Sequence, residues 1–454
     1  MERRLNILGA GLCGSLLAIM MARRGYSVCV RELRSDPRRT QVAAGRSINL
    51  ALSARGIRGL KQAGVYAGVE ALLLPMHGRM IHEANGETNL LPYGQKAHEF
   101  INSVSRAELN RLLIDIAEGE FGVEFLFEHA VSSFDKVTGE LEIADGNQPY
   151  LLDAGPVIAA DGAGSKIRKA FNGDPAIDPS ESLLPHSYKE LTIPPGDDGS
   201  FQLDPTALHI WPRGDYMLIA LPNPGGDFTL TLFMPNEGEA SFAALDTPDA
   251  IERFFAANLD SAARLIPDLA ASFERNPTGI LGTVRCQHWH QDHRFLLIGD
   301  AAHAIVPFHG QGMNLAFEDC VVLDGVLEEL GLPERDEDWA TVFATFESRQ
   351  IANAHAIADM ALENYIEMRD SVLDPTFVLQ RELSFELERR CPDRFIPRYS
   401  MVMFHDEIPY AEAQERGRIQ ADILTSLTRD ATSLAEIDMR HAETVIAERL
   451  PPIQ

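Results

Sequence analysis

The sequence predicts an α/β fold that combines a nucleotide-binding domain, an inserted β-sheet domain and a C-terminal helical region. A strand–helix–strand pattern over residues 5–32 predicts a parallel sheet at the start of the chain. Residues 186–235 alternate between polar and apolar side chains, which is typical of a separate sheet. From about residue 320 the pattern is mainly helical to the end of the chain.

Composition excludes several classes of protein. The chain has 454 residues, which is enough for two or three domains. Its formal net charge of −27 removes most of the attraction to a phosphate backbone, so we expect no nucleic-acid partner. Its five cysteines lie far apart and lack the spacing of zinc ligands. They favour a reducing, cytoplasmic location and predict no metal site.

Three glycines follow the first strand in the spacing GxGxxG. Gly9 allows a tight turn, Gly11 lets a pyrophosphate approach the backbone, and Gly14 lets the helix pack closely on the strand. Glu32 ends the second strand, where a carboxylate can accept hydrogen bonds from ribose hydroxyls. The pattern predicts a Rossmann-type dinucleotide site, but it does not choose between NAD and FAD.

The later elements suggest how the domains are interleaved. A helix is expected at 106–120, short strands within 121–160, and a return to a buried strand and helix at 295–304. Because the nucleotide-binding pattern is interrupted and then resumes, we expect two domains that share a cleft. The expected domains are residues 1–180 with 280–330 for dinucleotide binding, including part of the substrate cleft near 75–105; 181–279 for a mainly β substrate domain; and 331–454 for the helical region.

Two further acidic motifs follow buried strands. Asp161 and Gly162 end one strand, although a short acidic turn is also common in ordinary loops. Asp300 ends another strand, where it can reach a ribose-type hydroxyl. The segment 307–314 then forms a glycine-bearing loop that enters a helix, and NH groups at a helix start favour an electron-rich oxygen. For His309 within this loop, a structural role and a contact to the cofactor both remain open.

These three motifs, in this order and spacing, resemble the FAD-dependent aromatic hydroxylases, the group A flavoprotein monooxygenases. The resemblance implies that the dinucleotide is FAD, so that the first domain is a Rossmann-type FAD-binding domain. Arg106 matches the family's arginine near the flavin phosphate or ribitol, although a surface arginine is the ordinary alternative. One departure is that the family's GADG is AADG here. The implied cofactor-binding residues are Gly9, Gly11, Gly14, Glu32, Arg106, Asp161, Asp300, Gly312, Met313 and Asn314.

Other segments are similar to the branch of this family that hydroxylates L-kynurenine, and they span residue 5 to about 410. They are 45–53, 78–82, 91–94, 208–223, 307–314, 361–368 and 394–402. The resemblance implies that Arg79 binds the substrate carboxylate. The residues implied to assist it, or to line the ring side of the pocket, are Tyr93, Asn364, Tyr399, Phe233, Phe308, His309 and, as catalytic support, Glu367. Each of them taken alone has an ordinary role in a turn, core or surface as its alternative.

The resemblance implies a monooxygenase that uses NADPH and O2 and forms 3-hydroxykynurenine through a flavin C4a-hydroperoxide, in tryptophan degradation. No second glycine fingerprint marks a site for NADPH, which suggests transient binding. The charged C-terminal tail predicts no stable membrane anchor and a soluble, bacterial-like, cytoplasmic form. Two alternatives stay open: an FAD-dependent reductase or hydroxylase of another small aromatic substrate, and a flavin-bound protein without catalysis.

Overall fold

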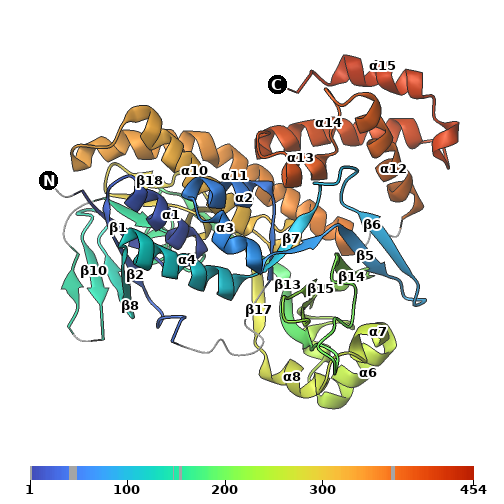
Figure 1. Cartoon of the computed structure of the whole chain (residues 1–454), viewed down its shortest axis with the longest axis horizontal. Coiled ribbons are helices and arrows are strands. Elements are labelled where there is room, and N and C mark those ends of the chain that lie inside the picture. The colour runs from blue at the N-terminus through green and yellow to red at the C-terminus, as the bar shows by residue number, and fades with distance from the viewer. Residues whose placement is uncertain (1–2, 40–48, 147, 153–155, 370–373, 454) are drawn as a thin grey trace. The chain divides into compact units, whose positions relative to one another are not determined.

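The computed structural model describes residues 3–39, 49–146, 148–152, 156–369 and 374–453 (Figure 1). Contacts divide the chain into two compact units. The first unit comprises Met1–Leu73, Ser103–Leu184 and Ile280–Ala358. The second comprises Leu74–Asn102, Pro185–Gly279 and Asp359–Gln454. Each unit is therefore assembled from three separate segments of the chain.

A mainly parallel sheet organises the first unit, with the strand order β18-β19-β12-β1-β2-β8. Its strands are β1 (Arg4–Leu8), β2 (Ser27–Glu32), β8 (Glu124–Phe127), β12 (Val157–Ala159), β18 (His290–Gln291) and β19 (Phe295–Leu297). Only β18 among these pairs antiparallel to its neighbour. The carboxyl ends of the parallel strands therefore meet at one edge, which is where such sheets bind ligands. A smaller sheet contains β9 (Ala130–Phe134), β10 (Leu141–Ala144) and β11 (Tyr150–Leu151). The other short strands are β3 (Asn49–Leu52), β7 (Ile101–Ser105) and, in the second unit, β4 (Leu74–Met76).

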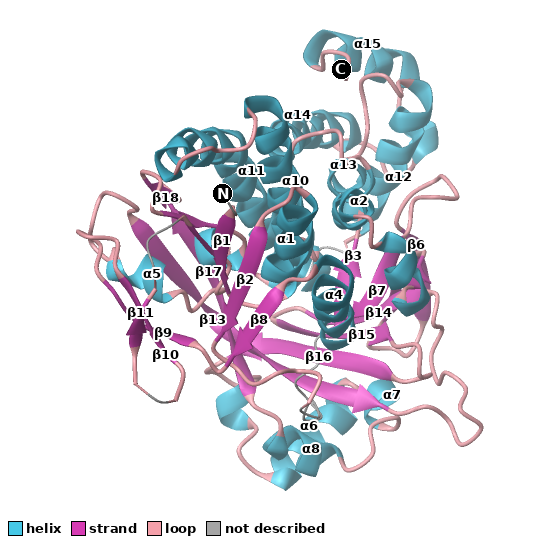
Figure 2. Cartoon of the chain, turned by 60° about the vertical axis from the view of Figure 1, so that its left-hand side comes forward, coloured by secondary structure: helices cyan, strands magenta, loops and turns pink. Residues whose placement is uncertain are grey.

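Helix α1 (Leu12–Arg23) is the central helix of the first unit (Figure 2). It is apolar on nearly all sides because it packs against the sheet and against helices α4 (Arg106–Phe121) and α10 (Gly312–Leu330). The other helices of this unit are α2 (Ala54–Ala63), α3 (Tyr66–Val69), α5 (Lys166–Ala170), α9 (Asp300–His303) and the first part of α11 (Trp339–Arg369). The expected strand–helix–strand pattern at the start of the chain is confirmed.

A larger, mainly antiparallel sheet organises the second unit, with the order β17-β13-β16-β15-β14-β5-β6. Its strands are β5 (Gly78–His82), β6 (Thr88–Pro92), β13 (Pro179–Ile193), β14 (Ala207–Arg213), β15 (Tyr216–Pro222), β16 (Phe228–Pro235) and β17 (Thr278–Cys286). Part of residues 75–105 is expected from the sequence to belong to the nucleotide-binding domain. Contacts instead group Leu74–Asn102 with this sheet, because β5 pairs with β14.

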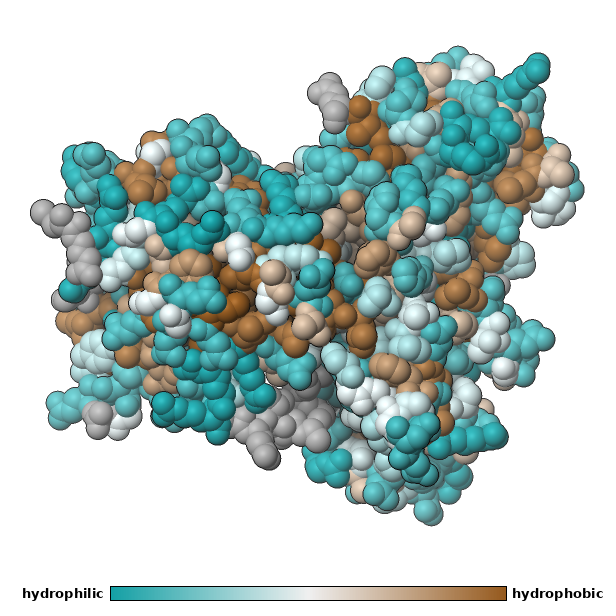
Figure 3. Space-filling model, in the orientation of Figure 1, coloured by the Kyte–Doolittle hydropathy of each residue, from teal (hydrophilic) through white to brown (hydrophobic). Residues whose placement is uncertain are grey.

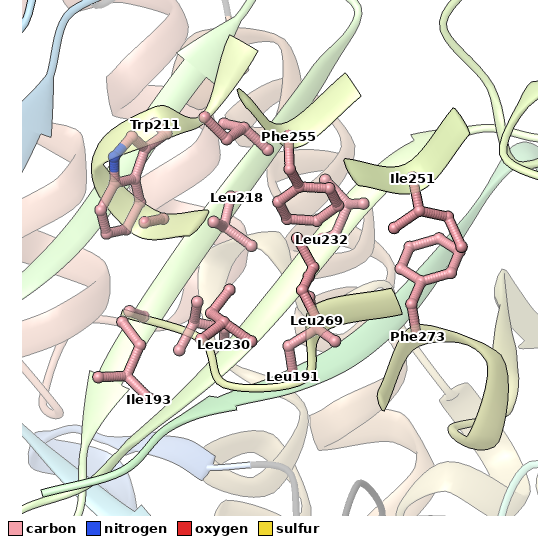
Figure 4. Close-up of a cluster of buried hydrophobic side chains, with 14 of the residues drawn as sticks. Leu191, Ile193, Trp211, Leu218, Leu230, Leu232, Ile251, Phe255, Leu269 and Phe273 are labelled. Carbon is pink, nitrogen blue, oxygen red and sulfur yellow. The ribbon is translucent and has the colours of Figure 1, made fainter. Parts of the chain in front are cut away.

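Alternation along these strands separates the two faces of the larger sheet. One face carries Trp211, Leu218 and Leu232, which are opposite one another in the strand register. They belong to an apolar core that helices α6 (Pro248–Asn258), α7 (Asp260–Ala263) and α8 (Leu269–Arg275) cover, with Phe255 and other side chains directed at the strands (Figure 4). The opposite face carries Arg79. Its register partner on β14 is Leu208, which lies an odd number of positions from Trp211 and so points away from this core.

The C-terminal helices of the second unit have a separate apolar core. After the end of α11 they are α12 (Pro375–Arg390), α13 (Arg398–Phe404), α14 (Tyr410–Thr428) and α15 (Met439–Arg449). Leu383, Leu387, Ile423 and Ile446 are fully buried in this core.

Much of the face drawn in Figure 3 is hydrophilic, with hydrophobic side chains in small groups. No helix of the described residues is long and apolar enough to cross a membrane.

A stack of aromatic rings lies within the second unit beside the core. His82 stacks on Trp211 with ring centroids 4.0 Å apart, and its Nε2 lies 2.8 Å from Nδ1 of His209. Nε2 of His209 lies 2.9 Å from the backbone oxygen of Asp204. Burial, followed by the nearby His209 and Arg213, lowers the pKa of His82 to about 4. Burial also lowers the pKa of His209, so both rings are neutral at pH 7.

Because of the buried pair of His82 and His209, we expect the protein to lose stability in mild acid. The unfolded chain protonates His82 near pH 6.5, whereas the folded chain does so only near pH 4. The free energy of unfolding should therefore fall as the pH drops from about 6.5 to 4, by on the order of 2–3 kcal/mol from this group. Urea unfolding at pH 7 and pH 5 should show a smaller change for His82→Gln than for the wild type. His441→Gln, at an exposed position, is the control. Equal pH dependence in all three proteins would contradict this prediction.

Candidate functional site

The glycine loop between β1 and α1 has the shape of a phosphate cradle. Gly9 has a φ of +95°, and a Cβ there would lie 2.5 Å from the carbonyl oxygen of Ala160. A Cβ at Gly14 would lie 2.0 Å from the carbonyl oxygen of Gly9. At Gly11, by contrast, a Cβ would meet no atom within 4 Å. Two glycines thus allow close packing, and the third leaves open space over the backbone.

Side chains from β2 and α4 hold this loop. The Glu32 carboxylate accepts hydrogen bonds from the backbone NH groups of Ala10, at 2.8 Å, and Arg34, at 2.9 Å. From α4, the Asn110 amide donates to the carbonyl oxygen of Ala10 at 3.0 Å. Arg106 is exposed one turn before Asn110, and residues four apart share a helix face. Arg106 is therefore on the side of α4 that meets the glycine loop.

Asp161 follows β12 and adjoins the same loop through Ala160. Its Oδ2 accepts a hydrogen bond from the backbone NH of Lys166 at 3.3 Å. Its Oδ1 is buried and makes no hydrogen bond within the described residues. Burial raises the pKa of Asp161, although its hydrogen bond with Ser165 acts in the opposite direction. Since a buried polar atom without a partner costs free energy, Oδ1 is suited to a ligand hydroxyl.

The turn after β19 carries the motif that begins at Asp300, and it packs against the start of α1. Gly299 has a φ of +61°, and a Cβ there would lie 3.0 Å from Sγ of Cys13 in α1. Asp300 follows it as the first, exposed residue of α9. Asp319 holds the turn, because its Oδ2 accepts from the NH of Gly299 at 3.0 Å and lies 2.6 Å from Nε2 of His303. Burial by itself lowers the pKa of His303, but the Asp319 carboxylate outweighs it, so the pKa is raised.

The loop before α10 is held by the side chain of Asn314. Its amide donates to the carbonyl oxygens of Ala51 and Gly310, both at 2.8 Å, and its Oδ1 accepts from the NH of Ser53 at 2.9 Å. This amide is therefore fully engaged in holding the loop to β3 and the start of α2. Any contact that Asn314 makes with a cofactor would come from its backbone.

The other predicted site residues of this segment are Phe308, His309, Gly312 and Met313. Phe308 and His309 lie in a short 3-10 turn, Pro307–His309, and both side chains are about 5% exposed. Gly312 and Met313 form the first turn of α10. All four belong to the first unit, together with the glycine loop and both acidic turns.

A second group of polar residues gathers around Arg79 on β5, wholly within the second unit. Arg79 Nη1 lies 3.0 Å from Oε1 of Glu367, and its Nη2 lies 3.5 Å from Oδ1 of Asn364. Its guanidinium faces the rings of Tyr399, at 4.9 Å, and Tyr93, at 5.9 Å. The two rings stack with centroids 5.4 Å apart. Strand β5, helices α11 and α13, and the end of β6 thus converge on one cation.

Burial and charge set the protonation of this group. Burial by itself lowers the pKa of Arg79, but the surrounding tyrosines and Glu367 outweigh it, so the pKa is raised. Burial also raises the pKa of Tyr93 and of Tyr399, so both hydroxyls stay protonated at neutral pH. Burial and the charge of Arg79 lower the pKa of a second guanidinium, Arg381 of α12, to about 10. Arg381 therefore remains a cation near Arg79.

Phe233 lies on the same face of the larger sheet as Arg79. It is paired with Met217 and Tyr188 in the strand register, out of phase with the apolar core. Its ring lies 6.2 Å from that of Tyr188, and its side chain is buried. Arg79 and Phe233, both predicted from the sequence as site residues, thus lie on one side of the sheet.

Some site residues have no signal in the sequence. Asn110, Asp319 and Arg381 are single polar residues within helices, and their partners are separated from them by 16 positions or more. Acidic residues about two turns after a glycine-bearing helix start are the closest available signal for Asp319. Of the segment 45–53, residues 45–48 lie outside the described residues.

Comparison with known proteins agrees with this geometry. The family model described as "FAD binding domain" matches residues 3–182 and 242–358. Kynurenine 3-monooxygenase of Stenotrophomonas maltophilia is 48% identical over 455 residues, covering 100% of this chain and 98% of the relative. The enzyme of the same name from Xanthomonas axonopodis pv. citri is 47% identical over 454 residues, covering 100% and 98%.

The chain belongs to the FAD-dependent aromatic hydroxylases. The resemblance noted in its motifs is therefore confirmed, as is the expected fold class. Among solved structures, 2-methyl-3-hydroxypyridine-5-carboxylic acid oxygenase is similar with a TM-score of 0.65 and 19% identity, covering 83% of this chain and 95% of that one. PqsL of P. aeruginosa has a TM-score of 0.64 and 21% identity, covering 82% and 97%. These two structures support the fold.

The residues of the first unit fit FAD. The open space over Gly11 and the buried Oδ1 of Asp161 are both features that a dinucleotide would use. We propose that the glycine loop, Glu32, Arg106, Asp161, Asp300 and the start of α10 hold it.

Substitution of Asp161 tests this assignment. Because Asp161→Ala removes a carboxylate that we place against a cofactor hydroxyl, the dissociation constant for FAD should rise about 10- to 100-fold. Flavin fluorescence during titration of the apoprotein measures it. Asp197→Ala, at an exposed loop position, is the control. An unchanged dissociation constant in Asp161→Ala, with the fold intact by circular dichroism, would contradict the assignment.

Proposed function

We propose that this enzyme hydroxylates L-kynurenine to 3-hydroxykynurenine, with NADPH and O2 as co-substrates, as a step of tryptophan degradation. The observation that carries the proposal is Arg79. Its Nε is buried and donates no hydrogen bond within the described residues, and its Nη2 has a long contact, 3.5 Å, to Oδ1 of Asn364. Two donors on one edge of a guanidinium match the two oxygens of a carboxylate. The substrate's α-carboxylate would satisfy both.

The balance of charge around Arg79 supports a carboxylate as the ligand. Arg79 and Arg381 are cations, and Glu367 is the one carboxylate that pairs with Arg79 in the described residues. These three side chains alone sum to one positive charge, and Glu382, next to Arg381 in the chain, acts on Arg381 as a further carboxylate. Because burying a charge without a partner is costly, the arrangement favours a ligand with one negative group. The protonated hydroxyls of Tyr93 and Tyr399 would add directional hydrogen bonds.

Each group of residues has a separate task in this proposal. Arg79, Tyr93, Asn364 and Tyr399 bind the carboxylate and so fix the substrate's orientation. Phe233, Phe308 and His309 would enclose the aromatic ring and exclude water, and Glu367 would support the site by holding Arg79. Bound FAD would supply the redox chemistry, with reduction by NADPH and a flavin C4a-hydroperoxide as the oxygen donor. These last two features rest on the family resemblance alone.

The second candidate is hydroxylation of another small aromatic acid. The Arg79 group recognises a carboxylate and does not by itself select the ring. The names of the relatives, at 46–48% identity over nearly the whole chain, favour kynurenine over other acids.

The first test is turnover by the purified, FAD-loaded protein. NADPH oxidation and O2 uptake should depend on L-kynurenine and should be accompanied by a product heavier by one oxygen atom, measured by mass spectrometry. NADH in place of NADPH is the control for the reductant. If NADPH oxidation is indifferent to kynurenine and no hydroxylated product forms, the proposed substrate is wrong, although the family assignment stands.

Arg79→Lys tests the carboxylate clamp more sharply than removal of the charge. Lysine keeps the charge but lacks the planar fork, so KM for kynurenine should rise at least about tenfold. Arg264→Lys is the matched control, since Arg264 is a surface residue that pairs only with Asp260 one turn earlier among the described residues. An unchanged KM in Arg79→Lys would rule out bidentate binding by Arg79.

A further inference from the structure

The segment that carries Tyr93 has no regular structure of its own. We call residues 93–100, between β6 and β7, the Tyr93 loop. Tyr93 itself is anchored by its backbone NH, which donates to the carbonyl oxygen of His77 at 2.9 Å. The rest of the loop includes exposed residues, such as Gln95 and Lys96. Something other than secondary structure must therefore hold it in place.

One restraint comes from within the loop. The Glu99 side chain is fully buried, and its Oε2 accepts from the backbone NH groups of Gln95, at 2.7 Å, and Lys96, at 3.0 Å. Its Oε1 lies 2.9 Å from Nζ of Lys96. A Cβ at Gly94 would lie 2.2 Å from Glu99 Oε2, so the chain closes tightly over this carboxylate. Burial alone would raise the pKa of Glu99, but Lys96 and the two NH groups lower it, so the carboxylate stays charged.

The other restraint comes from helix α12, in the same unit. Glu388 is 3% exposed, and each of its carboxylate oxygens has a partner in the Tyr93 loop. Oε1 accepts from Nζ of Lys96 at 2.9 Å, and Oε2 accepts from Nε2 of Gln95 at 3.0 Å. Nε2 of Gln95 also donates to the carbonyl oxygen of Phe385 at 2.9 Å. A buried carboxylate is tolerated only when it is paired, and here both partners belong to the loop.

The same side of α12 also reaches the residue before Tyr93. Arg381 donates to the carbonyl oxygen of Pro92. Arg381, Phe385 and Glu388 are spaced by four and three residues, which places them on one face of the helix. The opposite side of α12 is attached to the C-terminal helices through Leu383 and Leu387. Packing of α12 onto those helices therefore does not depend on Glu388, whose hydrogen bonds all go to the loop within the described residues.

We propose that Glu388 is a positioning residue for the substrate clamp. Through Gln95 and Lys96 it holds the Tyr93 loop, so that the Tyr93 ring stays stacked on Tyr399 beside Arg79. Helix α12 thereby sets the position of Tyr93 through the Tyr93 loop, in addition to the charge that Arg381 contributes near Arg79. This inference rests on the proposed function, since it assigns Tyr93 to the substrate.

Three variants of the FAD-loaded enzyme test the proposal. Glu388→Ala removes both hydrogen bonds, Glu388→Gln keeps one acceptor, and Glu386→Ala is the control on the same helix. Glu386 pairs only with Arg389 and Arg390 of its own helix within the described residues. Kinetics with L-kynurenine, equilibrium binding of L-kynurenine followed by the flavin absorbance, and thermal midpoints should be measured for each.

We expect Glu388→Ala to raise both KM and the dissociation constant for L-kynurenine about tenfold, with kcat changed far less. Glu388→Gln should recover part of the affinity, and Glu386→Ala should behave as the wild type. A merely structural role would lower the thermal midpoint and leave KM unchanged. If Glu388→Ala does not fold, Gln95→Ala removes the same restraint from the loop side and should raise KM in the same direction.

The outcomes separate this inference from the proposed function. A wild type that turns over kynurenine, with a KM within about twofold in Glu388→Ala or Gln95→Ala, overturns the role of Glu388 alone. A wild type that does not bind or hydroxylate kynurenine overturns the proposed function and this inference with it.

Discussion

The buried guanidinium of Arg79 is the constraint around which the second unit is arranged. A buried cation must be compensated, and within the described residues one carboxylate, Glu367, pairs with it directly. Two tyrosine rings supply the remaining favourable surface. The Nε donor of Arg79 has no hydrogen-bond partner within the described residues. A buried donor without a partner costs free energy, which is why we propose that a ligand carboxylate binds it.

This constraint explains why so many elements meet at Arg79. Strand β5 supplies Arg79, α11 supplies Glu367 and Asn364 one turn apart, and α13 supplies Tyr399. Alternation along β5 keeps Arg79 off the apolar core and on the face that carries Phe233. The first unit is constrained instead by the space that a cofactor needs. There, Gly11 leaves open space over the backbone and Asp161 has a buried oxygen without a partner in the described residues. Asp319 and Asn314 hold the neighbouring loops in place.

The sequence predicts well what depends on neighbouring residues. The glycine loop, the strands that flank it and the alternating strands of the larger sheet follow from local periodicity, and the structure has them in these places. Arg79 and its neighbours were expected only from family resemblance, because no local pattern links strand β5 to helix α11. Contacts such as Asn110 with Ala10, or Glu388 with Gln95, join residues about 100 and 290 positions apart. They depend on tertiary packing, which periodicity does not encode.

Recognition of the carboxylate by Arg79 is the central claim, and a ligand cycle tests it most directly. The dissociation constants of L-kynurenine and of the same amine without its α-carboxylate should be measured for the wild type and for Arg79→Met. If the clamp binds the carboxylate, the wild type should prefer L-kynurenine by about 100-fold, and Arg79→Met should show almost no preference. A preference of equal size in both proteins would mean that the carboxylate is bound elsewhere, and the account of the second unit would be wrong.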